Sequence, residues 1–122
     1  MEFKAYFGEF VGTFILTSIG CSAVAFDILF GAFSSIIQVA LLWGLGVALA
    51  IYVVKQYSKA HLNPAVSLGF ALLKESPVKQ FLSNCFFQLT GGIMAGLFVY
   101  LIFVSSICLL YTSDAADDSL RV

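Results

Sequence analysis

Few side chains in this sequence have the chemistry that catalysis or metal binding needs, and they lie far apart. The 122-residue chain has one histidine, His61, with no acid or cysteine beside it in the sequence. Its cysteines, Cys21, Cys85 and Cys108, lie in apolar stretches without metal-ligand spacing. A nucleophile needs a nearby base, and no such pair stands out. We therefore predict no catalytic residue, metal or cofactor, and an enzyme is the least favoured class.

The composition is that of a membrane protein. Hydrophobic residues make up 61% of the chain and charged residues 11%, against about 25% charged in a soluble domain. The mean hydropathy is +1.01. The net charge of −1 gives no electrostatic footprint for nucleic acid. We expect the lipid bilayer to be a partner of this chain, and nucleic acid not to be one.

Long uncharged stretches indicate the elements that position the remaining polar residues. A helix needs about 20 apolar residues to cross the hydrocarbon core. Three stretches reach that length, and we expect membrane-spanning helices at about 5–26, 34–54 and 80–104. A cleaved signal peptide is the alternative for the first, although its basic segment and cleavage site are poor. The predicted fold class is an all-α membrane protein.

Lysines set the expected orientation. Lys4 precedes the first predicted span, and Lys55, Lys59, Lys74 and Lys79 lie between the second and third. Positive residues favour the cytoplasmic side. We expect a multi-pass protein of the cell (inner) membrane, with its N-terminus in the cytoplasm.

A fourth uncharged stretch, 60–73, is too short to cross the membrane. Asn63 is a good helix N-cap, and Pro64 suits the first helical position. A helix from Pro64 to Leu73 would cross about half of the hydrocarbon core. We predict a re-entrant loop and half-helix at about 58–73, with both ends cytoplasmic. The alternative is a helix lying in the membrane interface, which the lack of a charged face disfavours.

The residues around this stretch resemble those of a known family. The segment His61–Ser67, HLNPAVS, resembles the first signature loop of the aquaporin and glycerol-facilitator (major intrinsic protein) family. Supporting motifs are EFVGTF at Glu9–Phe14, WGLGVALAIY at Trp43–Tyr52 and QLTGG at Gln88–Gly92. The second motif is similar to the glycerol-conducting branch. The resemblance covers about residues 6–104.

Members of this family have two inverted halves, and only the first is visible here. The second Asn-Pro-Ala loop and the arginine beside it are missing. We expect residues 1–107 to be the N-terminal half of a channel domain. The polar, acidic segment 108–122 is expected to be non-native read-through, with a genuine acidic tail as the alternative.

The resemblance implies roles for the loop residues. Asn63 would donate a hydrogen bond to a passing water or hydroxyl oxygen at the start of the half-helix, Pro64-Ala65. The carbonyls of Lys59, Ala60 and His61 would form an acceptor ladder leading to it. The family usually has glycine in place of Lys59, whose side chain should reach towards the cytoplasm.

Three further side chains have implied or argued roles outside that ladder. The His61 ring is expected to fix the loop by hydrogen bonding and to help line the inner vestibule. Glu9 would accept hydrogen bonds from the re-entrant loop, with proton relay as the alternative. Trp43 would form the apolar wall of the outer filter, or be a plain interfacial anchor.

These features predict a channel half for passive permeation of glycerol, other small neutral solutes and water. A water-selective aquaporin and a non-conducting fragment or accessory membrane protein are the alternatives. A full-length protein of this family is expected to be a homotetramer.

Overall fold

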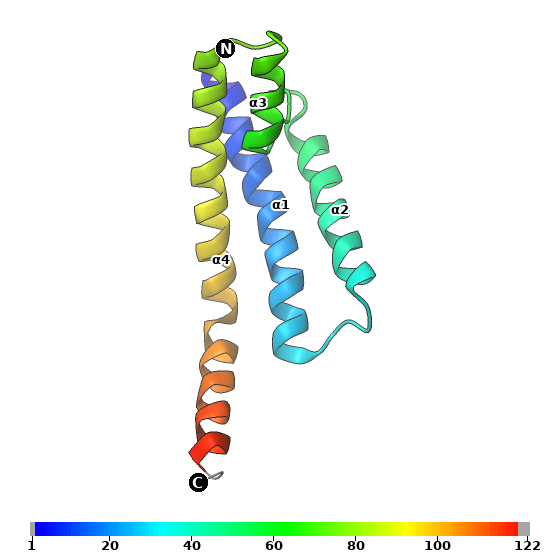
Figure 1. Cartoon of the computed structure of the whole chain (residues 1–122), viewed down its shortest axis with the longest axis vertical. Helices are drawn as coiled ribbons and strands as arrows, with labels where there is room; N and C mark the ends of the chain where they lie inside the picture. Colours follow the sequence, from blue (N-terminus) through cyan, green and yellow to red (C-terminus); the bar gives the residue numbers. More distant parts are fainter. Residues whose placement is uncertain (1, 120–122) are drawn as a thin grey trace.

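The computed structural model describes residues 2–119, and these residues form helices and connecting loops without a β-strand. Three of the helices are long and one is short. In Figure 1 the long helices lie side by side, and the short helix lies at the end of the molecule where the chain begins. The bounds are α1 Glu2–Phe30, α2 Ile36–Val54, α3 Pro64–Leu72 and α4 Val78–Ser119. The three long helices are apolar and long enough to span a membrane. The predicted all-α class is confirmed.

The turn between α1 and α2 lies later in the sequence than predicted. The first helix continues past 26 to Phe30, and Gly31 then takes a left-handed φ of +58° while its N–H bonds to the Asp27 carbonyl at 2.7 Å. The Asp27 carboxylate accepts a bond from the Phe33 amide at 3.1 Å. Asp27 thus stabilises the turn instead of ending the helix. Ser35 caps α2 by accepting from the Ile37 amide at 3.2 Å.

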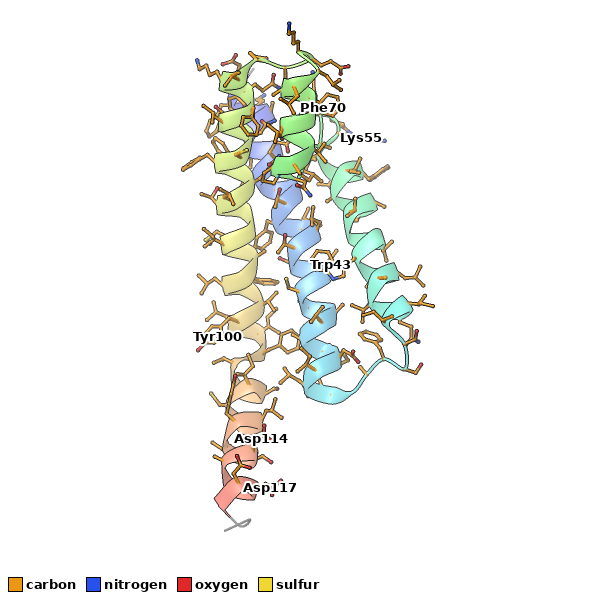
Figure 2. All side chains as sticks on the ribbon, in the orientation of Figure 1. Trp43, Lys55, Phe70, Tyr100, Asp114 and Asp117 are labelled. Atoms are coloured by element: carbon orange, nitrogen blue, oxygen red, sulfur yellow. The ribbon has the colours of Figure 1, made fainter. Side chains whose placement is uncertain are left out.

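The last helix also extends beyond its predicted end at 104. No glycine or proline follows Gly96, so no residue interrupts the helix. Thr112 donates to the carbonyls of Cys108 and Leu109 within the same helix. Figure 2 shows Asp114 and Asp117 on the part of α4 that extends past the other helices. The foreign origin of 108–122 stays a prediction, and its last residues, 120–122, lie outside the described part.

Close helix packing puts α1 between α2 and α4. A side chain at Gly12 would collide with Leu62, and one at Gly20 would collide with the indole of Trp43. A side chain at Gly91 of α4 would collide with the backbone carbonyl of Phe10. Gly91 therefore lets the backbones of α1 and α4 approach closely, as small residues do in membrane proteins. Gly12 and Gly20 make room for the side chains of Leu62 and Trp43. The short helix α3 packs beside α4.

Candidate functional site

The segment between α2 and α3 carries most of the predicted site. It has no regular structure, and two of its residues adopt left-handed φ angles without being glycine: Ala60 at +53° and Leu62 at +51°. Each such conformation costs on the order of 1–3 kcal/mol and persists only where the surroundings fix it. The loop ends at Asn63, whose side-chain oxygen accepts from the Ala65 amide at 2.9 Å. Pro64 is the first helical residue of α3, as its sequence position predicts.

The carboxylate of Glu9 in α1 stabilises this loop by accepting hydrogen bonds from it. Its side chain is only 1% exposed. One carboxylate oxygen accepts from the His61 amide at 3.0 Å and from the Ser58 hydroxyl, and the other accepts from the Leu62 amide at 2.7 Å. Hydrogen bonds to a charged acceptor are worth about 1.5–3 kcal/mol each. Glu9 therefore provides hydrogen-bond acceptors for backbone amides that this irregular loop does not pair within itself.

The same carboxylate connects the loop to α4. Gln88 donates from its side-chain nitrogen to Glu9 at 2.8 Å and to the hydroxyl of Ser67 at 3.0 Å. Ser67 is the buried residue of α3 and is fully enclosed. Three helices and one loop thus meet in a single polar network.

His61 occupies the other side of this network. Its ring is 5% exposed and stacks on Phe70, with centroids 4.5 Å apart and planes 8° apart. Its Nδ1 lies 3.0 Å from the Ser67 hydroxyl and 3.3 Å from the side-chain nitrogen of Asn84. Since the Asn84 nitrogen can only donate, the ring nitrogen facing it accepts. The buried Nε2 has no partner in residues 2–119.

The other predicted loop residues lie outside the buried network. Lys59, Asn63, Pro64 and Ala65 are exposed, and Ala60 is half-buried. Within residues 2–119 the side-chain nitrogen of Asn63 has no protein hydrogen-bond partner. The loop therefore presents a bare amide donor at the start of α3, where the helix dipole is positive.

A polar cavity opens beside the loop. It has a volume of about 300 Å³ and is lined from α1, the loop and α4, with Glu9, Lys59, Gln80 and Asn84 among its walls. Irregular backbone next to such a cavity can be reached by water. No group of metal-ligating side chains gathers in the part of the chain that the structure describes.

Trp43 does not join this cluster. Its indole packs on Gly20, and Figure 2 shows it between α1 and α2, away from the end that carries Phe70 and Lys55. The side chain is half-buried. The structure thus brings Glu9 and His61 together around the loop and leaves Trp43 at a separate level.

Sequence reasoning missed Ser58, Ser67 and Asn84 as members of the network and met Gln88 only within a motif. One signal was available. Asn84 and Gln88 are four residues apart in an uncharged span, so both lie on one helix face. Polar side chains in a membrane helix need partners on neighbouring elements.

Comparisons with known proteins agree with this architecture. The family model described as "Major intrinsic protein" matches residues 1–120. "Aquaporin NIP3-1" of Arabidopsis thaliana is 41% identical over 79% of this chain and 30% of its own length. The "Probable glycerol uptake facilitator protein" of Thermotoga maritima is 35% identical over 83% of this chain and 44% of its own.

A solved structure has the same fold. The aquaglyceroporin from Plasmodium falciparum superposes with a TM-score of 0.83 at 32% identity, covering 88% of this chain and 45% of the other. The chain therefore spans less than half the length of each of these three relatives.

Proposed function

The chain belongs to the major intrinsic protein family, and from this premise we propose that it supplies one half of a pore for glycerol, other small neutral solutes and water. The observation that carries the proposal is the loop at Asn63. The side-chain nitrogen of Asn63 has no hydrogen-bond partner within residues 2–119 and lies at the start of α3. Glu9 accepts hydrogen bonds from the backbone that precedes it.

The proposed mechanism follows from the chemistry of this loop. A neutral solute with hydroxyl groups gives up hydrogen bonds to water on entering a narrow pore, and protein groups must replace them. Asn63 donates to a solute oxygen, and the carbonyls of Lys59 and Ala60 accept from its hydroxyls. The positive end of α3 favours oxygen lone pairs and repels cations, including hydronium.

We propose a pore that conducts glycerol as well as water, and not water alone, because of Trp43. Its indole offers a flat apolar wall for the carbon edge of a polyol, as the resemblance to the glycerol-conducting branch implies. A water-selective pore is the second candidate, since one of the relatives above is named an aquaporin. A non-conducting role is the third, because the matched region is under half of each of these relatives.

The proposed setting is a cell membrane, with the N-terminus in the cytoplasm. Its support is the placement of Lys4 in the first turn of α1 and of Lys55, Lys59 and Lys74 between α2 and α4, since positive residues favour that side. A complete protein would work as a homotetramer, an expectation that comes from the family resemblance.

A chimera tests the proposal. Residues 1–107 replace the matched segment of the Thermotoga maritima protein, and the product is reconstituted in vesicles. Stopped-flow light scattering measures glycerol and water permeability. We expect both to exceed those of empty vesicles, with no proton conductance. The relative itself is the positive control.

The outcomes separate the three candidates. Water flux without glycerol flux would leave a water channel. A folded chimera without either flux, beside a conducting relative, would contradict a pore role. The 122-residue chain alone should show no glycerol flux, because one half-helix reaches only the membrane midplane.

A further inference from the structure

An apolar groove lies between α1 and α2, near the end where α1 begins and α2 stops. Its volume is about 340 Å³, within the range of ligand-binding pockets. The walls are Phe7, Gly8 and Val11 of α1 with Val53 and Val54 of α2. None of these side chains is polar, and the groove includes no predicted pore residue.

The groove has a structural cause. Gly8 and Gly12 face the loop, where added side chains would meet Ser58 at 2.8 Å and collide with Leu62. The loop thus occupies the space over these two glycines. On the adjoining face of α1, beside the last turn of α2, Phe7 is exposed and Val11 is half-buried.

The walls are open to whatever surrounds the helices. Phe7 is 51% exposed and Val53 43% exposed. Both belong to helices long and apolar enough to span a membrane. In such a setting the medium that meets an exposed apolar groove is the acyl region of the bilayer.

One rim of the groove is polar and positive. Lys4 lines the groove one helical turn before Gly8, and Tyr57 lines it from the loop. Within residues 2–119 no acid forms an ion pair with Lys4. Glu2 lines a different cavity, together with Lys79 and Gln80 of the α4 side.

A second ammonium lies on the neighbouring helix end. The Lys55 nitrogen is 4.6 Å from the centre of the Tyr52 ring. Lys55 lines the polar cavity beside the loop, together with Ala5 of α1 and Gln80 of α4. At the groove itself, the Lys4 ammonium therefore stands at the rim of an apolar slot, a combination that attracts anionic lipid headgroups.

We propose that this groove binds one anionic phospholipid of the lysine-side leaflet. An acyl chain lies against Phe7, Val11 and Val53. The phosphate lies at the Lys4 ammonium, and the Tyr57 hydroxyl donates to the phosphate or an ester oxygen.

Fluorescence quenching by brominated lipids tests the site in the full 122-residue chain. A Trp43→Phe background removes the single natural tryptophan, and Phe7→Trp places a reporter in the groove. The chain is reconstituted in phosphatidylcholine vesicles containing graded amounts of brominated phosphatidylglycerol or brominated phosphatidylcholine. The ratio of the two quenching curves gives the relative affinity at the reporter. A Leu45→Trp reporter, 62% exposed on α2 away from the groove, is the matched control.

We expect roughly fivefold preference for phosphatidylglycerol at position 7, the effect of one lysine near an anionic surface. Lys4→Gln should abolish the preference, and Lys4→Arg should keep it. High salt should weaken it, because the charges are at the surface. Position 45 should show no preference.

Two results would overturn the proposal. Equal quenching by both lipids at position 7 would mean that the groove holds any acyl chain without headgroup recognition. Absence of quenching by either lipid, with normal quenching at position 45, would mean that protein covers the groove. Because no flux is measured, neither result depends on the proposed pore function.

Discussion

The α1–α2 pair and the α3 region are held in different ways. In the first, shape complementarity dominates: Trp43 packs over Gly20, and Gly46 lies against Ile19 of α1. In the second, hydrogen bonds dominate: Ser67 is the buried residue of α3, and it bonds to Gln88 of α4.

The difference reflects what each region must do in a membrane. Lipid tails are as apolar as leucine, so burying apolar surface between helices gives little stability there. Close backbone approach suffices for two helices whose own hydrogen bonds are complete. A loop has unpaired backbone groups and needs partners such as Glu9. Substitutions in the two regions should therefore differ in how much unfolding free energy they cost and in which property of the protein they change.

Glu9→Gln should give the largest effect. An amide has one acceptor oxygen in place of two, and its nitrogen would face either the His61 or the Leu62 amide, each of which now donates to its own oxygen of Glu9. Buried donors left without partners cost about 1–3 kcal/mol each, so we expect a loss of roughly 3 kcal/mol or more. Reversible unfolding in dodecyl sulfate, followed by circular dichroism, measures it. Glu2→Gln, at an exposed position, is the control. Equal stability of the two variants would mean that Glu9 does not stabilise the loop.

Gly20→Leu tests the shape-packed region and should cost less. The new side chain would displace the Trp43 indole, and overpacking of this kind costs about 1–3 kcal/mol. The same unfolding assay applies, and Trp43 fluorescence should report the change of environment. Gly44→Leu is the matched control for Gly20→Leu, because Gly44 has open space beside it and a leucine there displaces no side chain. If both variants behave alike, close approach at Gly20 does not hold the pair together.

Ser67→Ala should cost about 1 kcal/mol, the usual value of a buried hydrogen bond. The hydroxyl bridges Gln88 and the His61 ring, so both lose a partner. Ser18→Ala is the matched control, because the buried Ser18 hydroxyl has no partner in residues 2–119. Its removal should leave the unfolding free energy unchanged or slightly higher. A larger loss at Ser18 than at Ser67 would contradict the polar account of α3.

Trp43→Phe should have the smallest effect on stability, and its main effect should be on selectivity. Removing part of an apolar wall changes a solute contact by about 1–3 kcal/mol at most. In the chimera we expect a lower ratio of glycerol to water permeability, both measured on one vesicle preparation. An unchanged permeability ratio would mean that Trp43 only packs against Gly20 and does not contribute to selectivity.

The sequence predicted the start of α3 because capping is local chemistry. Asn63 and Pro64 are adjacent to the helix they begin, and the structure starts α3 at Pro64. It predicted three spans because their lengths follow from uncharged stretches. The extension of α1 to Phe30 and that of α4 past 104 were missed, since Asp27 stabilises a turn and α4 contains no residue that stops it early.

The buried network could not be predicted in full, because its members meet only in three dimensions. Glu9 and Gln88 are far apart in the sequence, and no local pattern states which residues face each other. The loop carbonyl roles and the pore role of Asn63 stay predictions. They depend on the solute, whose contacts the fold alone does not determine.

The central claim is that Asn63 serves as a pore donor as well as a helix cap, and Asn63→Asp in the chimera tests it most directly. Aspartate can still cap α3, so the free energy of unfolding should stay within about 1 kcal/mol of that of the unsubstituted chimera. The change replaces a donor by an anion, so glycerol permeability should fall at least about tenfold, equivalent to 1.4 kcal/mol. Stopped-flow permeability is measured beside unfolding on the same preparation. Normal glycerol flux from a folded variant would mean that Asn63 only caps the helix.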